Sequence, residues 1–193
     1  MTATTTTSLP AGLTPGTWLI ETSHSSAAFT VRHAGISKAR GTFAIAEGVL
    51  TIGEDLASTA VTATLDAASV DTKDAGRDGH LKSADFFDVE TYPTWTFTST
   101  SISPRGDDHV IAGDLTIHGV TRPVELVTEF NGAATDPFGA ARIGFSAKTE
   151  ISRKDFGLTW NQALETGGLV VGDRIDIEIE VEAVQQQAVA AAS

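Results

Sequence analysis

The sequence predicts an all-β fold, a closed antiparallel β-barrel of about eight strands. The first indication is that apolar and polar residues alternate along most of the chain, as where Ile175, Ile177 and Ile179 are separated by Asp176 and Glu178. A period of two is typical of antiparallel strands with one buried and one solvated face. The second indication is that glycine-containing turns separate many of these segments. Because closure removes the exposed edges of so many long strands, a barrel is favoured over the alternative, a two-sheet sandwich.

The expected strands follow the alternating segments in order. Val61, Ala63 and Leu65 define one of them, and Ile143 and Phe145 define another. We expect strands near 17–22, 27–33, 39–52, 58–70, 94–103, 108–118, 122–134 and 140–151, with a ninth candidate at 173–184. Strands therefore account for most of the chain between its two ends.

Helical segments are scarce in this pattern. The best candidate spans residues 74–83 and begins at Asp74, a suitable N-cap residue. Gly76 and Gly79 inside this segment weaken the helix. A second short helical turn is expected around 161–165. Neither segment is long enough to form a helical layer, so we place one or two short helices in the connections between strands.

The size of the chain fits one domain with a tail at each end. Residues 1–15 are rich in threonine, glycine and proline, and residues 185–193 carry no turn or cap signal. We therefore expect a disordered N-terminal segment at 1–15 and a flexible C-terminal tail at 185–193. The barrel domain then spans residues 16–184.

The composition argues against several classes of function. Thirteen basic against 25 acidic residues give a net charge of −12, which repels phosphate backbones, so nucleic acid is not an expected partner. No apolar run approaches the ~18 residues of a membrane-spanning helix. The chain has no cysteine, which excludes disulfides and thiolate chemistry. The N-terminus lacks the basic and apolar regions of a secretory signal, so we expect a cytoplasmic protein; a secreted form with its signal removed is the alternative.

The inward face of the strands decides whether the barrel has a solid core or a ligand cavity. An eight-stranded barrel is just wide enough to be filled by side chains or to hold one slender ligand. Periodicity leaves both alternatives open, although small residues within strands, such as Ala27, Ala28 and Ala63, favour a cavity. The expected inward residues are Phe29, Val31, Phe43, Ile45, Leu65, Trp95, Phe97, Ile111, Leu115, Phe145 and Ile177.

No sequence motif indicates catalysis or metal binding. The five histidines form no HExxH or other closely spaced ligand set, and an extended strand keeps His24 and His33 far apart. There is no GxSxG elbow and no phosphate-binding loop. Asp85, Asp88 and Glu90 offer paired carboxylates, but caps and turns near a bend explain them more simply. We expect no catalytic residues, no metal ligands and no cofactor.

Charged residues near the strand ends allow two interpretations. Arg32 and His33 lie in one strand, Arg77 and His80 lie in the helical connection, and Arg153 follows the strand at 140–151. Such charges either form ion pairs that fix the connections, or provide a polar rim that holds the head group of an apolar ligand.

The most specific feature is a series of motifs that runs in order through the globular part. The motifs are ETSHS at 21–25, FTVRH at 29–33, RGTF at 40–43, RDGHLKSADFFDV at 77–89, YP at 92–93, GDLTIHGVTRPV at 113–124 and RKDFG at 153–157. Together they strongly resemble the YceI-like family, and the resemblance extends from about residue 16 to residue 183.

The resemblance implies an extended, lipocalin-like barrel whose elongated cavity binds a polyisoprenoid or another long amphiphile, such as an isoprenoid quinone. It also implies a carrier or sequestering role without catalytic activity, in some members as a homodimer. We therefore expect a non-enzymatic protein that binds, sequesters or transports a long-chain isoprenoid-type lipid in its barrel.

The expected binding site combines inward strand positions with the connection at 74–97. In that connection Leu81, Phe86 and Phe87 are expected to pack inward, while Arg77 and Asp78 help to hold it as a lid. The predicted ligand-binding residues are Phe29, Val31, His33, Phe43, Ile45, Phe86, Phe87, Trp95, Phe97, Leu115 and Phe145, with Arg32, Arg77 and His80 as polar candidates for the head group.

Two rival functions make different predictions. An enzyme that acts on a bound lipid, with His33 or His80 as its base, requires a histidine–carboxylate pair inside the cavity. A solid-core domain used for protein contacts or stress protection has no continuous tunnel.

Overall fold

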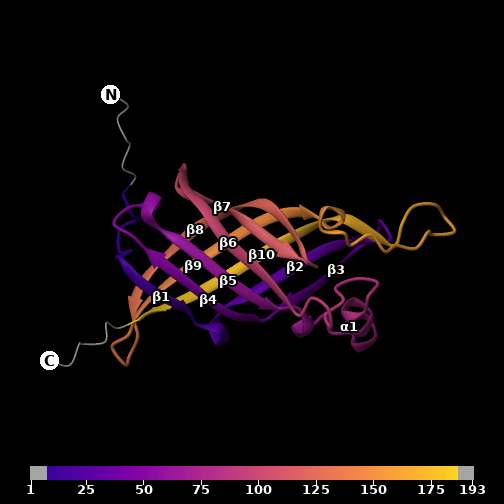
Figure 1. Cartoon of the computed structure of the whole chain (residues 1–193), viewed down its shortest axis with the longest axis horizontal. Helices are drawn as coiled ribbons and strands as arrows, with labels where there is room; N and C mark the ends of the chain where they lie inside the picture. The colour runs from indigo at the N-terminus through magenta and orange to yellow at the C-terminus, as the bar shows by residue number, and fades with distance from the viewer. Residues whose placement is uncertain (1–7, 187–193) are drawn as a thin grey trace.

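The computed structural model describes residues 8–186, which form mainly antiparallel strands (Figure 1). Ten strands follow one another: β1 (Gly16–Ile20), β2 (Ser26–His33), β3 (Ser37–Phe43), β4 (Ile45–Ile52), β5 (Ala60–Asp66), β6 (Thr94–Arg105), β7 (Asp108–Ile117), β8 (Val120–Thr135), β9 (Ala141–Ser152) and β10 (Val171–Gln185). The strand expected at 39–52 is divided at Ala44 into β3 and β4, and the ninth candidate is present as β10.

The strands close into a barrel. Each strand from β4 to β10 pairs antiparallel with the next, and β1 joins β4 to β10. β10 pairs with β2 along residues 171–180 and with β1 along residues 183–185. β1 with β2, and β3 with β4, therefore each occupy one position in the wall, and the result is the predicted eight-stranded barrel. The two-sheet sandwich is wrong, because the hydrogen-bonded ladder returns to its first strand.

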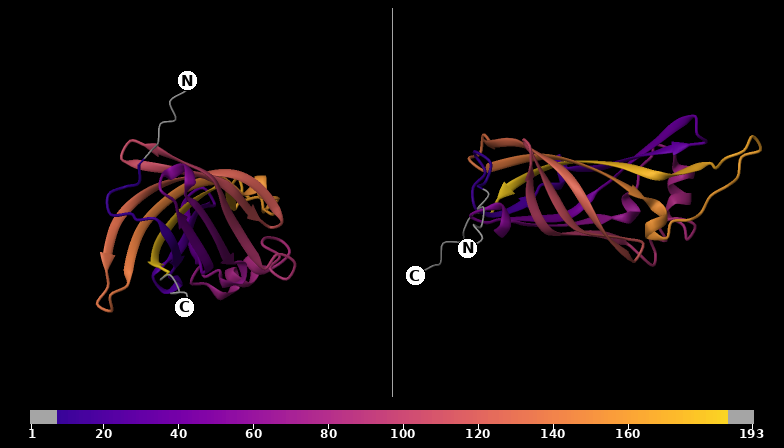
Figure 2. Two further views of the ribbon diagram at one scale, coloured as in Figure 1. Left: turned by 60° about the vertical axis from the view of Figure 1, so that its left-hand side comes forward. Right: turned by 90° about the horizontal axis from the view of Figure 1, so that it is seen from above.

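The barrel is elongated, and its two ends differ. One end carries the helix α1 (Ala75–Lys82), and the other carries the start of β1 and the end of β10 (Figure 1). We call these the helix end and the terminal end. Figure 2 shows that the β2–β3 hairpin and the connection between β9 and β10 project beyond the barrel at the helix end.

The helix predicted at 74–83 is confirmed. The Asp74 side chain caps α1 by accepting a hydrogen bond from the backbone N–H of Arg77 at 2.9 Å, and the helix ends at Lys82. The remaining short helical turns are 3₁₀ segments: η1 (Thr22–His24), η2 (Leu56–Ser58), η3 (Ala67–Ser69) and η4 (Arg153–Phe156).

The helical turn predicted around 161–165 is wrong. Ala163 forms an isolated antiparallel bridge with Leu169, so this connection is extended and folds back on itself. The Asn161 side chain holds it in this form through bonds to the backbone N–H and carbonyl of Val171, at 3.0 and 2.7 Å. Gly167 and its neighbour Gly168 make the turn with φ angles of 87° and 94°, which glycine adopts without strain.

The tails are described only in part. Residues 1–7 and 187–193, on which much of the expected disorder falls, lie outside the described residues. Residues 8–15 lie at the terminal end, where Leu13 is buried and its N–H donates to the carbonyl of Pro10 at 3.1 Å. The indole N–H of Trp18 donates to the carbonyl of Thr14 at 3.2 Å, which ties this segment to β1.

The buried residues form two hydrophobic clusters, one towards each end. Phe43, Trp95 and Phe156 belong to the cluster at the helix end, whereas Trp18 and Ile143 belong to the cluster at the terminal end. Burial of such large side chains is worth about 1.5–3 kcal/mol each, so both ends contribute to the stability of the barrel.

One part of the wall is open between neighbouring strands. β8 and β9 pair from Val127 and Lys148 towards the terminal end, but residues 120–126 of β8 pair only with β7. Residues 149–152 of β9 pair only with β10. We call these two segments, 120–126 and 149–152, the seam. Because strand pairing stops there, both segments have backbone groups without a neighbouring strand on the side that faces the seam.

Candidate functional site

A cavity of about 260 Å³ occupies the barrel interior. Its lining runs from Pro10 and Leu13 at the terminal end to Leu81 and Val171 at the helix end. The lining side chains are apolar or aromatic apart from Thr59, His109, Thr128, Thr149 and Arg153. An apolar cavity with a few polar groups is the usual form of a site for a small, mostly hydrophobic ligand.

The alternating sequence pattern produces this lining. In β10, Ile175, Ile177 and Ile179 line the cavity. The residues between them point outward, where Asp176 forms an ion pair with Lys38 at 3.7 Å. Because successive side chains of a strand point to opposite faces, the same pattern repeats around the barrel.

Most of the predicted ligand-binding residues lie on the cavity wall. The strand residues Phe29, Val31, Phe43, Ile45, Trp95, Phe97, Leu115 and Phe145 line the cavity, together with Phe86 and Phe87 from the connection after α1. The other inward candidates, Leu65, Ile111 and Ile177, also line it.

His33 is the exception among the predicted lining residues. It is exposed and pairs with Ser37 at the tip of the β2–β3 hairpin. This hairpin extends past the barrel at the helix end (Figure 2), so the last residue of β2 no longer faces the cavity. The prediction that His33 lines the cavity is therefore wrong.

The three polar candidates for the head group also lie off the cavity wall. Arg32 is exposed on β2. Arg77 donates from Nε to the hydroxyl of Thr72 at 2.8 Å and from Nη2 to its carbonyl at 3.0 Å. His80 contacts the carboxylate of Asp85 at 2.9 Å, with both side chains partly exposed. Arg77 and His80 hold the connection in place, which is the alternative interpretation of these charges.

Asp78 completes this arrangement. Its carboxylate accepts bonds from the backbone N–H and the hydroxyl of Thr72, at 2.9 and 2.6 Å. Arg77 and Asp78 thus both bind Thr72, which fixes α1 against the segment before it, where Asp71 forms an isolated antiparallel bridge with Thr42 of β3. The Leu81 side chain then lines the cavity from the same helix, as expected for a lid.

An aromatic layer forms the cavity wall at the helix end. The ring centroid of Phe43 lies 4.3 Å from that of Trp95 and 5.5 Å from that of Phe29. Phe87 lies 4.9 Å from Trp95 in an edge-to-face arrangement, and Phe86 lies 5.1 Å from Trp160. Such contacts add to the stabilisation from burial alone, so this end of the cavity has a well-defined wall.

The sequence placed Arg153 only among the charges of a possible polar rim, and not among the predicted ligand-binding residues. This residue begins η4, is only 3% exposed and lines the cavity. Burial lowers the pKa of its guanidinium below the ordinary value, and the charge of Asp173 partly opposes this effect. The sequence signals were its place at the start of the RKDFG motif and directly after an apolar strand, and neither distinguishes a buried arginine from an exposed one.

The histidine–carboxylate pairs that the structure describes lie outside the cavity. They join His80 to Asp85, and His24 to Glu21 and Glu182. None of these five residues lines the cavity. Within residues 8–186, the structure thus lacks the feature that the lipid-modifying enzyme predicts.

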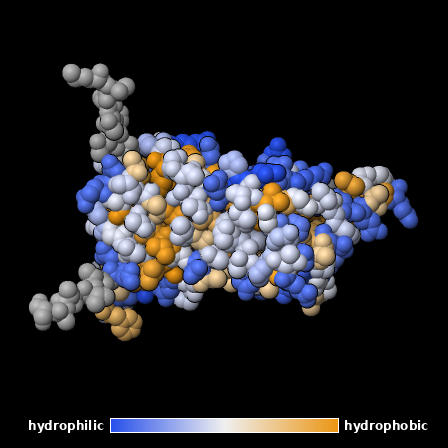
Figure 3. Space-filling view, viewed as in Figure 1, coloured by the Kyte–Doolittle hydropathy of each residue, from blue (hydrophilic) through white to orange (hydrophobic). Residues whose placement is uncertain are grey.

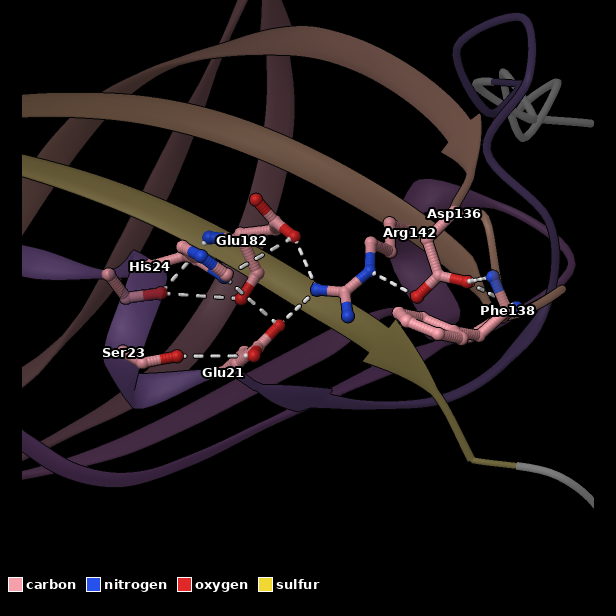
Figure 4. A network of polar contacts seen from close by, with 9 residues as sticks. Glu21, Ser23, His24, Asp136, Phe138, Arg142 and Glu182 are labelled. Carbon is pink, nitrogen blue, oxygen red and sulfur yellow. Dashed lines mark hydrogen bonds and ion pairs between the residues drawn. The ribbon is translucent and has the colours of Figure 1, made fainter.

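A polar network on the outer wall near the terminal end resembles a metal site in its donor set (Figure 4). Ligand atoms of Glu21, His24 and Glu182 all lie within 4.8 Å of one another. Arg142 from β9 donates to both carboxylates and, through Nε, to Asp136 at 2.9 Å. Because the guanidinium already supplies the positive charge that these carboxylates need, the network is an ion-pair cluster that links β1, β9 and β10.

A second hollow, of about 290 Å³, lies over the seam. Its lining shares Val124, Thr149 and Ile151 with the inner cavity and also includes Arg122 and Glu150 on the outside. Side chains of only one layer therefore separate the cavity from solvent at the seam. The face of the molecule shown in Figure 3 is mainly hydrophilic, with apolar residues gathered towards the terminal end. In the described part of the chain, no helix has the length and apolar character needed to cross a bilayer.

Comparison with known proteins finds one family. A sequence profile described as the YceI-like domain matches residues 18–183. The chain is 42% identical over 168 residues to the protein named YceI from Escherichia coli O17:K52:H18, and the match covers 86% of this chain and 85% of the relative. The YceI protein of Salmonella arizonae is 39% identical over the same length, with the same coverage.

Solved structures share the fold. The YCEI protein of Campylobacter jejuni superimposes with a TM-score of 0.66 at 32% identity, covering 81% of this chain and 90% of that one. BcnA of Burkholderia cenocepacia gives a TM-score of 0.71 at 23% identity, covering 84% and 98%. A structure from Saccharophagus degradans, described as a polyisoprenoid binding domain, gives 0.65 at 16% identity, covering 88% and 98%. The last two comparisons concern the fold alone.

Proposed function

This chain belongs to the YceI-like family, and we propose that its barrel binds a long-chain isoprenoid-type lipid, a polyprenyl chain or an isoprenoid quinone, and carries or sequesters it without changing it chemically. The observation that supports this proposal most directly is the apolar cavity between the two ends of the barrel. The polyisoprenoid-binding domain of Saccharophagus degradans, which has the same fold, supports the same class of ligand.

The energetics of such a cavity suit a long hydrocarbon chain. One isoprene unit removes roughly 100 Å² of apolar surface from water, which is worth roughly 2–3 kcal/mol. Several units therefore give ample affinity even after the cost of ordering the chain. Affinity is expected to rise with chain length until the cavity is full.

The cavity also argues against the solid-core alternative. A barrel filled by its own side chains has no space that reaches from Leu13 to Leu81, whereas both residues line this one. Small residues such as Ala27 and Ala63 lie on its wall, where larger side chains would fill the space. We therefore infer a ligand-binding interior.

The first test of this proposal is the content of the purified protein and its uptake of lipid. We expect mass spectrometry of organic extracts from gently purified full-length protein to show a stoichiometric isoprenoid. Protein stripped of lipid should bind a long-chain isoprenoid quinone, measured by quenching of tryptophan fluorescence. Repeated empty extracts, together with no uptake of the quinone, would falsify the proposal.

Two neighbouring residues of β5 provide a matched pair of variants. Ala63 lines the cavity, whereas Thr62 is exposed on the outer face. Ala63→Phe places a ring in the lipid path and should weaken quinone binding about tenfold or more, since one displaced isoprene unit is worth that much. Thr62→Phe should bind as the wild type does. Equal binding by both variants would show that the lipid does not occupy this cavity.

A further inference from the structure

A buried arginine gives the cavity one polar end. We propose that Arg153 is a head-group site, at which Nη2 donates hydrogen bonds to an anionic oxygen of the lipid, a carboxylate or a phosphate, while the apolar chain extends towards the terminal end. This inference rests on the proposed function, because it specifies which class of amphiphile the same cavity takes.

The hydrogen bonds of Arg153 leave one nitrogen free. A guanidinium has five N–H groups, one on Nε and two on each Nη. The Nε group donates to the carbonyl of Gly172 at 2.9 Å, and Nη1 donates to the carbonyls of Leu158 and Trp160 at 2.7 and 2.9 Å. Nη2 is buried and has no partner among the residues that the structure describes. Since buried donors are nearly always bonded, Nη2 is expected to bind a ligand atom.

The charge of Arg153 is also not neutralised by a direct ion pair with any described residue. Within residues 8–186 it forms no salt bridge with a carboxylate. The nearby Asp173 carboxylate instead accepts bonds from the hydroxyl of Ser152 at 2.8 Å and from the backbone N–H of Lys154 at 3.3 Å. An unpaired charge next to an apolar cavity is costly, and an anionic ligand oxygen removes that cost more fully than a neutral one.

The position of the unpartnered donors sets the direction of the ligand. Trp95, which also lines the cavity, has a buried indole N–H without a partner in the described protein. Trp95 belongs to the hydrophobic cluster at the helix end, and Arg153 lies at the same end, directly after β9. At the terminal end, the polar lining residue His109 is only partly buried, so water can satisfy it. The head group is therefore placed at the helix end.

The inference is tested with isoprenoids of one chain length and different head groups. We suggest geranylgeranoic acid, geranylgeranyl phosphate and geranylgeraniol, titrated into lipid-free full-length protein. The wild type should bind the acid, the phosphate or both at least tenfold more tightly than the alcohol. Equal binding of all three would overturn the head-group site and leave the proposed function intact. If the protein bound none of the three and also failed to bind a longer quinone, the proposed function itself would be overturned.

Two arginine variants separate a local effect from a general one. Arg153→Met should reduce the preference for the acid over the alcohol to about twofold or less. Arg174→Met is the matched control, because Arg174 is exposed on the outside and does not line the cavity; it should keep the wild-type preference. A preference that survives Arg153→Met would overturn the inference.

A second measurement does not depend on the folding of a variant, which matters because Arg153 also holds three backbone carbonyls, those of Leu158, Trp160 and Gly172. The acid labelled with ¹³C at its carboxyl group can be followed by NMR against pH while bound to the wild type. Beside an unpaired guanidinium its pKa should lie below that of the free acid, whereas an apolar cavity alone raises it. A raised carboxyl pKa would contradict the proposed contact.

Discussion

Two phenylalanines of the cavity wall lie directly over glycines of the neighbouring strand. Phe29 of β2 faces Gly41 of β3, where a Cβ atom would come within 2.6 Å of its ring. The ring of Phe97 covers Gly113 of β7 in the same way, at 2.4 Å. A side chain on either glycine would push the ring away from the wall, so these glycines set how far the rings enter the cavity.

Gly113→Ala is therefore expected to reduce both stability and lipid binding. The added Cβ would also lie 2.6 Å from the backbone carbonyl of Thr98, which a shift of the Phe97 ring cannot relieve. We expect a loss of about 1–3 kcal/mol in the free energy of unfolding, measured with urea. Gly144→Ala is the control, since its Cβ would meet Asn131 at 3.6 Å and the carbonyl of Val181 at 3.9 Å, both at ordinary contact distance. Similar losses in both variants would contradict this account.

At the scale of elements, the connection that carries α1 is held in place by hydrogen bonds and contributes apolar side chains to the cavity wall. Arg77 and Asp78 bind Thr72, and Leu81, Phe86 and Phe87 line the cavity. The polar residues of this connection therefore position the wall and need not contact the lipid themselves.

The seam is the element whose behaviour differs from the rest of the barrel. Amide protons in residues 149–152 lack β8 as a pairing partner, whereas residues 141–148 of the same strand have it. We expect the amides of 149–152 to exchange with deuterium about tenfold faster on average than those of 143–148, because local opening costs less where one ladder is missing. Hydrogen exchange followed by NMR measures this directly. Uniform protection along β9 would show that the seam is closed in solution.

At the scale of the whole molecule, closure depends on β10, which changes partner from β2 to β1 along its length. The change occurs where the backbone of Glu182 bonds to Glu21 at 2.8 Å and to the Ser25 hydroxyl at 3.0 Å. Arg142 joins the carboxylates of Glu21 and Glu182 at the same place (Figure 4). Three strand positions of the wall therefore meet in one ion-pair cluster.

This cluster predicts a pH dependence of stability. The hydrogen bond from Arg142, followed by that from His24, lowers the pKa of Glu21 below its ordinary value of 4.5. The pKa of Asp136 is also lowered. The main cause is the hydrogen bond that its carboxylate accepts from the backbone N–H of Ala140, and the next is the bond from the Arg142 side chain. A carboxylate whose pKa is lower in the folded state than in the unfolded state stabilises the fold at pH values above its unfolded-state pKa. This stabilisation is lost as the pH falls through the folded-state pKa.

Arg142→Gln tests this dependence. The stability difference between wild type and variant should be largest above about pH 4.5 and should shrink as Glu21 and Asp136 become protonated in acid. Urea unfolding at pH 7 and at a series of lower pH values measures it. Arg174→Gln, which removes an exposed ion pair with Glu150, should change the free energy of unfolding little at any of these pH values. A difference that is constant with pH would rule out the proposed cluster effect.

Much of the fold followed from local pattern. The alternation of Ile175, Ile177 and Ile179 predicted a strand with one apolar face, and the Asp74 cap predicted where α1 begins. The helical turn expected at 161–165 failed because the Asn161 side chain bonds to Val171, a contact that no local propensity contains. Likewise, His33 follows Phe29 and Val31 in the alternation that points into the cavity. The β2–β3 hairpin already projects beyond the barrel at this residue, so its side chain is exposed.

The sequence by itself determined that each strand carries two alternating sets of side chains, one of them mostly apolar, because successive side chains of a strand point to opposite faces. It also determined the family, through motifs that stand in order along the chain. Only the tertiary structure decided where the polar end of the cavity lies. Arg153 is buried there by carbonyls of Leu158, Trp160 and Gly172, which come together only when η4 folds against the start of β10. Burial of a charge depends on such distant partners, so no local pattern specifies it.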